Sequence, residues 1–177
     1  MSQAPEAWLR GPIESVDPYL MPVAHALVQA GEDLERAAAD LTPEELWARP
    51  GGAASIGFHL RHIAGVVDRL LTYANGEMLS EAQLRALRTE GEPGEPPAGA
   101  AELVRNAREA LARALDQVRR TPRDALLEPR AVGRARLPST VLGLLYHAGE
   151  HATRHTGQVI TTVRVLRGEA RPGGAER

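Results

Sequence analysis

The sequence contains no cysteine and no lysine. Without cysteine the chain has no disulfide, no thiolate metal ligand and no cysteine nucleophile, so any metal must be held by His, Asp or Glu. All 21 basic residues are arginines, and with 23 acidic residues they give a net charge of −2. Because nucleic-acid binding usually needs a basic face, we expect no nucleic-acid partner.

Long apolar runs are also missing. No stretch approaches the roughly 18 apolar residues that a membrane span needs, and residues 1–6 lack the basic start and apolar core of a secretory signal. Neither a P-loop nor a glycine-rich dinucleotide fingerprint occurs. We therefore expect a cytoplasmic protein, without a membrane segment. The 177 residues, 43% of them hydrophobic, suffice for one domain over residues 1–177 with a substantial core.

Apolar residues recur at helical spacing in four long segments. These are residues 18–41 (starting at Pro18 or Pro22), 55–76, 100–120 and 139–167, the last followed by Gly168. Capping patterns at Thr42 and Ser80 predict short helices over 42–47 and 80–88. We expect a surface loop over 90–99, irregular structure over 124–138, no strand, and a frayed tail over 169–177.

These elements predict an all-α fold. The four long helices suggest an antiparallel four-helix bundle with short extra helices, and its core would lie within about residues 17–167. The connection before the third long helix is long enough for a crossover. Facing helices of such a bundle can build a metal site between them.

Five of the six histidines fall in two of these long helices: His59 and His62 in the second, and His147, His151 and His155 in the last. Residues three and four apart on a helix share a face, with Cβ atoms about 5–6 Å apart. Two such imidazoles can bind one metal ion. Gln158 extends the stripe of the last helix, which apolar neighbours predict to face inward. Imidazoles buried there without partners would cost about 1–3 kcal/mol per unsatisfied group.

Spacing predicts a metal site between the two helices but does not decide which of the five imidazoles bind. His25 stands alone in the first helix, where we expect a structural or surface role. Glu150 points about 100° away from His151 on a helical wheel, which makes it a poor ligand. A carboxylate or carbonyl that orients the imidazoles is expected, but the sequence does not identify it.

Two segments resemble the DinB-like (YfiT-like) metalloenzyme family. The stretch SIGFHLRHIAGVVDRLL resembles the family's second helix and places a metal ligand at His62. The stretch HATRHTGQV resembles the family motif H-x-x-x-H-R-G-Q and places ligands at His151 and His155. Thr156 stands where the family usually has arginine, so a role of that arginine does not carry over.

The resemblance implies a four-helix bundle, often a homodimer, with a divalent metal ion on three histidines. Zinc or nickel is the expected ion, and iron or manganese also occurs. Family members include S-transferases and isomerases that use low-molecular-weight thiols such as mycothiol or bacillithiol. His59 and His147 are additional histidines, and these two, with Gln158, are further candidates for a ligand or for a hydrogen-bond partner of one.

Two functions are therefore in competition. The first is a metal-dependent enzyme, a thiol S-transferase or a related hydrolase acting on a small molecule, with His62, His151 and His155 as ligands. Three neutral ligands leave the ion its full positive charge, which favours Lewis acidity. The second is a non-catalytic metal-binding module for stress response or sensing, with His59 or His147 as fourth ligand. The catalytic residues themselves stay unassigned.

Overall fold

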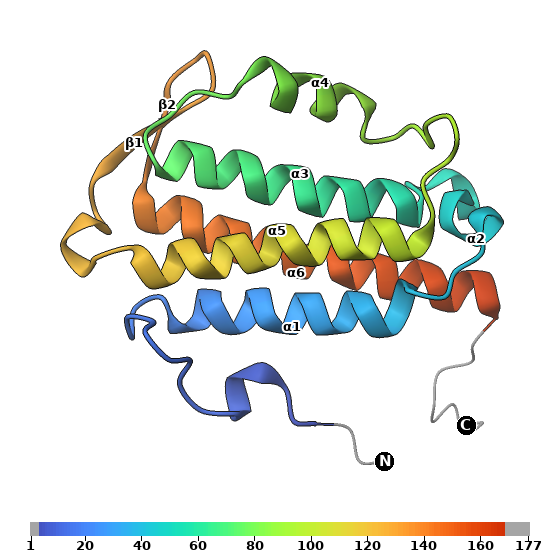
Figure 1. Cartoon of the computed structure of the whole chain (residues 1–177), viewed down its shortest axis with the longest axis horizontal. Coiled ribbons are helices and arrows are strands. Elements are labelled where there is room, and N and C mark those ends of the chain that lie inside the picture. Colours follow the sequence, from blue (N-terminus) through green and yellow to red (C-terminus); the bar gives the residue numbers. More distant parts are fainter. Residues whose placement is uncertain (1–3, 169–177) are drawn as a thin grey trace.

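The computed structural model describes residues 4–168, so the tail expected at 169–177 lies outside the described residues. The described part of the chain is mostly helical and contains six α-helices, three short 3₁₀ helices and a two-stranded sheet (Figure 1). The α-helices are α1 (Met21–Ala38), α2 (Pro43–Trp47), α3 (Ile56–Ala74), α4 (Glu81–Thr89), α5 (Ala100–Arg120) and α6 (Val141–Arg167). The 3₁₀ helices are η1 (Ala7–Leu9), η2 (Pro50–Gly52) and η3 (Arg123–Ala125).

Side-chain caps mark where the two short helices α2 and α4 begin, as the sequence predicts. The hydroxyl of Thr42 accepts a hydrogen bond from the backbone N–H of Glu45, and the Glu45 carboxylate returns one, which completes a capping box. Ser80 forms the same box with Gln83 at the start of α4. At the far end, Gly168 ends α6 in the left-handed conformation with φ 62°.

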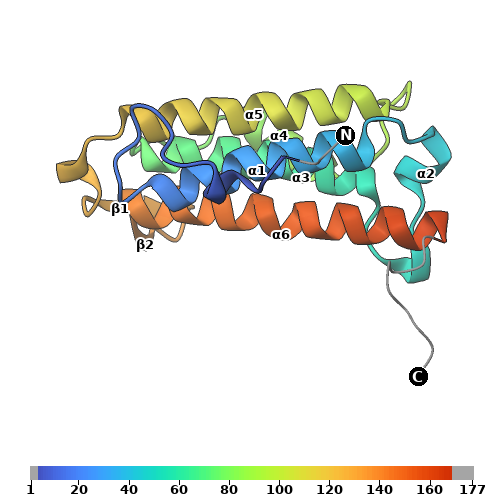
Figure 2. The same ribbon diagram turned by 90° about the horizontal axis from the view of Figure 1, so that it is seen from below.

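The four long helices α1, α3, α5 and α6 surround a common apolar core. Each of α1 and α3 packs against both α5 and α6, and Figure 2 shows α5 and α6 on opposite sides of the molecule. The largest fully buried side chains of the core are Leu20, Leu27, Leu34, Leu46, Ile56, Leu60, Ile63, Leu145, Val67, Val118 and Val159. Among residues 4–168, no helix combines the length and the apolar character that crossing a membrane requires.

The directions of the long helices correct the expectation of an antiparallel arrangement. In Figure 1, α1 and α6 run one way while α3 and α5 run the other. The neighbours α1/α5 and α3/α6 are therefore antiparallel, whereas α1/α6 and α3/α5 are parallel. A parallel pair needs a connection that returns to the starting end, and the segment of residues 75–99 provides it between α3 and α5. We call this segment the crossover segment.

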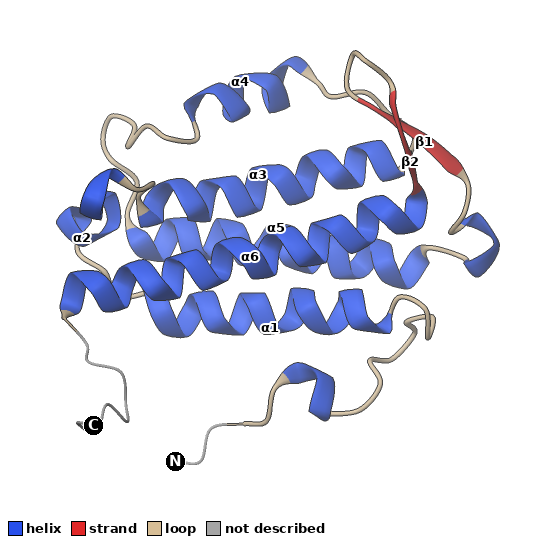
Figure 3. Cartoon of the chain, turned by 180° about the vertical axis from the view of Figure 1, so that it is seen from behind, coloured by secondary structure: helices blue, strands red, loops and turns tan. Residues whose placement is uncertain are grey.

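The crossover segment lies outside the four long helices. It contains α4, which packs along the outer side of α3 (Figures 1 and 3). No residue of α4 is buried. Immediately after α4, however, Glu90 is only 5% exposed. The expectation that residues 90–99 form a surface loop is thus wrong at its first residue.

The expectation of irregular structure over residues 124–138 is also wrong in part. Strands β1 (Pro129–Val132) and β2 (Leu137–Thr140) form an antiparallel hairpin in which Pro129 pairs with Thr140 and Val132 with Leu137. Four-residue strands with a proline in each show no period-2 pattern to recognise. The pairing depends instead on the turn, where Gly133 has φ 68° and its carbonyl accepts a hydrogen bond from the N–H of Arg136.

Candidate metal centre

Helices α3 and α6 bring three of the predicted histidines together. His62 on α3 faces His151 and His155 on α6, and one ligand atom from each of the three lies within 4.8 Å of the others. His62 Nε2 and His151 Nε2 are 2.9 Å apart. The ring centres of His62 and His155 are 4.5 Å apart, and those of His151 and His155 are 4.6 Å apart. We call these three residues the histidine triad.

His62 is oriented by a carboxylate that the sequence did not reveal. Its Nδ1 lies 2.7 Å from Oε2 of Glu90, and Oε1 of Glu90 accepts a 2.6 Å hydrogen bond from Arg69. A carboxylate paired with arginine accepts hydrogen bonds, so Nδ1 of His62 carries the proton. This leaves a lone pair on Nε2, which faces His151. Nothing in the sequence distinguishes Glu90 from the nearby Glu92 or Glu95, so the contact depends on the path of the crossover segment.

His59 contacts the triad without joining it. Its Nδ1 lies 3.0 Å from Nδ1 of His155, so one of these nitrogens donates a hydrogen bond to the other. Within the described residues, His59 is not among the group whose ligand atoms lie within 4.8 Å of one another. Burial, and to a smaller degree the neighbouring His62, lower the pKa of His59. The contact makes His59 a hydrogen-bond partner of His155.

The two histidines of α6 in the triad are neutral at physiological pH. Burial lowers the pKa of His151 to about 4, with smaller contributions from His62 and His147. Burial also lowers the pKa of His155 to about 4, and His62 and His151 add to the shift. Metal ligation requires neutral imidazole, so the site keeps these lone pairs available over a wide pH range.

His147 and Glu150 lie beside the triad member His151. The Nδ1 of His147 lies 3.3 Å from Oε2 of Glu150, and both side chains are partly exposed. These two residues and His151 form a second group with ligand atoms within 4.8 Å of one another, but Glu150 already accepts a 3.0 Å hydrogen bond from Arg154. Gln158 is exposed and shares a surface hollow with His59.

His25 lies apart from this group. Its Nε2 donates a 2.9 Å hydrogen bond to the backbone carbonyl of Gly11, which agrees with the structural role expected from the sequence.

The triad fits a divalent ion. The buried Nδ1 of His151 has no hydrogen-bond partner among the described residues, and its Nε2 meets only another imidazole nitrogen. Protein hydrogen bonds thus leave this ring poorly compensated for its burial. The nitrogens that face one another are the kind of donor that zinc and related ions prefer. The side chains present therefore match the requirements of a three-histidine metal site.

A helical protein with a cluster of histidines between two of its helices is a candidate helical metalloprotein. A comparison with protein families then identifies its family. The sequence model of the DinB superfamily matches residues 26–159, which is more than half of the chain and includes the whole triad. The chain belongs to the DinB superfamily, as the two histidine segments indicate. A comparison with curated proteins finds no significant match.

Proposed function

We propose that this protein is a metal-dependent enzyme that holds a divalent ion on His62, His151 and His155, between the helices of a four-helix bundle. The reaction that we propose is S-transfer from a low-molecular-weight thiol, or a related hydrolysis. One observation carries the proposal: the closely spaced triad consists of three imidazoles and includes no carboxylate. Such a ligand set leaves the charge of the ion uncompensated.

The chemistry that the ion supplies in such a site is Lewis acidity, which lowers the pKa of a thiol or a water molecule. Residues around the triad orient its imidazoles for metal binding. Glu90 keeps the proton of His62 on Nδ1, which turns the Nε2 lone pair toward the triad. His59 is engaged with His155 by a hydrogen bond, so three protein ligands leave positions open for a substrate.

A surface hollow supports the proposal of a small-molecule substrate. It has a volume of about 440 Å³ and borders His59, Arg154 and Gln158. The hollow therefore lies beside the ring that contacts His155. Its lining combines arginine, amide and hydroxyl groups with alanine and glycine, which suits a small molecule with both polar and apolar parts, such as a thiol.

Turnover assays with a panel of thiols and electrophiles test the function. We expect the metal-loaded protein to transfer one of the thiols, or to hydrolyse a test ester or amide, and His151→Ala to abolish both metal content and activity. His147→Ala is the matched control, because it removes an imidazole from the same helix face and leaves the triad intact. Activity that persists in metal-free protein or in His151→Ala would overturn the proposal.

The competing function is a non-catalytic metal-binding module, which needs a saturated coordination sphere. His59 is the nearest candidate for a fourth ligand, but its Nδ1 is directed at His155. Absorption spectra of the cobalt-substituted protein distinguish the two functions, since exchangeable positions respond to an added thiol. A spectrum that no thiol or small anion changes would favour the binding module. The homodimer and the identity of the ion stay predictions.

A further inference from the structure

We propose that Glu90 is a positioning residue that couples the metal centre to the docking of the crossover segment. The inference rests on the proposed metal site, because Glu90 acts through the ligand His62. Its Oε2 holds Nδ1 of His62 at 2.7 Å, and its Oε1 is held by Arg69 at 2.6 Å. The carboxylate that holds Nδ1 of His62 is therefore in position only while the crossover segment is docked.

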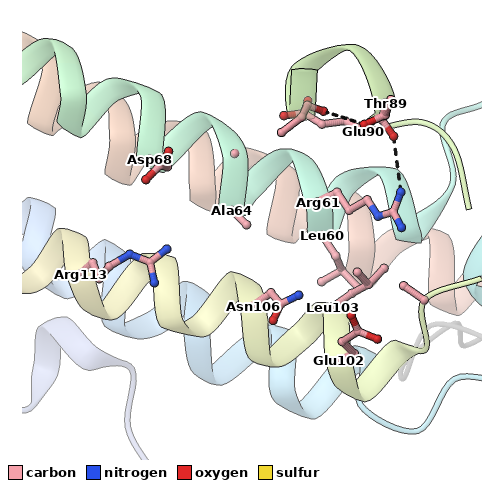
Figure 4. Close-up of a pocket in the computed structure, with 13 residues that line it drawn as sticks. Leu60, Arg61, Ala64, Asp68, Thr89, Glu90, Glu102, Leu103, Asn106 and Arg113 are labelled. Carbon is pink, nitrogen blue, oxygen red and sulfur yellow. Dashed lines mark hydrogen bonds between the residues drawn. The ribbon is translucent and has the colours of Figure 1, made fainter. Parts of the chain in front are cut away.

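The burial pattern of the crossover segment supports this coupling. Glu90 is the one buried residue between positions 75 and 99, all of which the structure describes. A cavity of about 570 Å³ lies between the crossover segment and the helices α3 and α5. The segment therefore does not pack closely against these helices along its whole length. Figure 4 shows Glu90 and Thr89 at the edge of this cavity, opposite Leu103 and Asn106 of α5. A segment with so little apolar burial depends on its polar contacts for docking.

A second side chain of α3 fixes the backbone around Glu90. Arg61 donates a hydrogen bond to the carbonyl of Thr89 (Figure 4). It also donates hydrogen bonds to the carbonyls of Glu92 and Pro93. Arg61 precedes the ligand His62 in the sequence. The same turn of α3 thus provides a metal ligand and holds the segment that orients this ligand.

Gly65 leaves the space that Glu90 occupies. A Cβ atom at position 65 would lie 2.4 Å from Oε1 of Glu90 and 2.7 Å from Nη1 of Arg69. Both distances are far below van der Waals contact, and each atom is already fixed by the ion pair. The absence of a side chain at this position is therefore a requirement of the contact between Glu90 and Arg69.

Coupling of this kind works in both directions. If docking of the crossover segment strengthens metal binding, then metal binding must stabilise the docked segment by the same factor. We therefore expect zinc to slow amide hydrogen exchange in residues 77–99. The effect on metal affinity should be 10- to 100-fold, the usual range for a partner that orients a metal-binding histidine.

The variant Glu90→Gln tests the coupling, with Glu92→Gln as matched control. Both variants lose one carboxylate in the same segment, but the side chain of Glu92 is exposed. Zinc affinity is measured by competition with a chromophoric chelator, and hydrogen exchange is measured with and without zinc. We expect Glu90→Gln to bind zinc about 10- to 100-fold more weakly and to lose the zinc-dependent protection of residues 77–99. Glu92→Gln should behave like the wild type.

Failure of this inference and failure of the proposed function give different results in these measurements. Equal zinc affinity of Glu90→Gln and the wild type would overturn the role of Glu90 and leave the proposed function standing. A wild-type protein that binds no divalent ion would overturn the proposed function, and this inference with it.

Gly65→Ala provides a second test should Glu90→Gln fail to fold. It leaves Glu90, Arg69 and His62 chemically intact but displaces the carboxylate, so zinc affinity should again fall. Gly31→Ala on α1 is its control, since a Cβ there would meet Leu111 at an ordinary 3.7 Å. Wild-type zinc affinity in Gly65→Ala would overturn the inference.

The tautomer of His62 gives a signature that a purely structural role of Glu90 would not produce. Long-range ¹H–¹⁵N correlation spectra of the metal-free wild type should show the proton on Nδ1 of His62. Finding the proton on Nε2 instead would overturn the inference.

Discussion

The ion pair between Arg69 and Glu90 allows a quantitative test of how burial sets the cost of breaking an ion pair beside the candidate metal centre. Its N–O distance is 2.6 Å, and the two side chains are only 8% and 6% exposed. The surface pair of Arg108 and Glu35 has the same 2.6 Å distance with exposures of 47% and 53%. The two pairs therefore have the same N–O distance and differ in burial.

Arg69→Met keeps the aliphatic part of the side chain and leaves Glu90 buried without its cation. Breaking a buried pair in this way costs about 3–5 kcal/mol, because an uncompensated charge remains. Arg108→Met removes the surface pair, which is worth about 0–1 kcal/mol in water. With a urea dependence near 2 kcal/mol per molar, Arg69→Met should lower the unfolding midpoint by roughly 1.5–2.5 M.

Urea unfolding of the metal-free proteins at pH 7, with the fold followed by circular dichroism, measures both effects. The double variant Arg69→Met/Glu90→Gln should be more stable than Arg69→Met alone, because it removes the unpaired charge. Equal midpoint shifts for Arg69→Met and Arg108→Met would refute the reasoning, since burial would then have no influence on the cost.

Three further predictions follow from the site and its surroundings. The pKa values of His151 and His155 are lowered to about 4, so between pH 6.5 and 4 the unfolded chain binds more protons than the folded chain. The free energy of unfolding of the metal-free protein should therefore fall as the pH drops through this range. Urea unfolding measures it, and a constant free energy would contradict the lowered pKa values. Gly57→Ala should destabilise the protein by about 1–3 kcal/mol, because a Cβ there would lie 2.7 Å from the ring of Trp47; thermal unfolding checks this, and an unchanged melting temperature would contradict it. His147→Ala should leave zinc affinity within about twofold of the wild type in a chelator competition, and a loss of tenfold or more, about 1.4 kcal/mol, would make His147 a ligand.

Helix positions could be predicted from the sequence because their determinants are local. The capping boxes at Thr42 and Ser80 and the glycine at 168 act within a few residues. The crossover between α3 and α5 could be predicted from the length of their connection, but the parallel pairing of α1 with α6 could not, since it depends on which end of the molecule each connection reaches. The hairpin of β1 and β2 could not be predicted, because its strands are too short to show the alternation of apolar and polar residues that marks a strand.

The histidine triad was predictable for a similar reason, while its surroundings were not. Spacing placed the histidines of each helix on one face, and the family resemblance selected His62, His151 and His155 among the five. The contact of Glu90 with His62 joins residues 28 positions apart, through a segment whose path no local pattern reveals. The pairing of His59 with His155 likewise depends on how α3 and α6 are aligned.

An anomalous difference map from crystals of the zinc-loaded protein would test the central claim most directly. We predict one strong peak that lies about 2.0–2.1 Å from a ring nitrogen of each of His62, His151 and His155, the usual Zn–N distance. A peak between His147 and Glu150, or no peak near the triad, would contradict this account of the site.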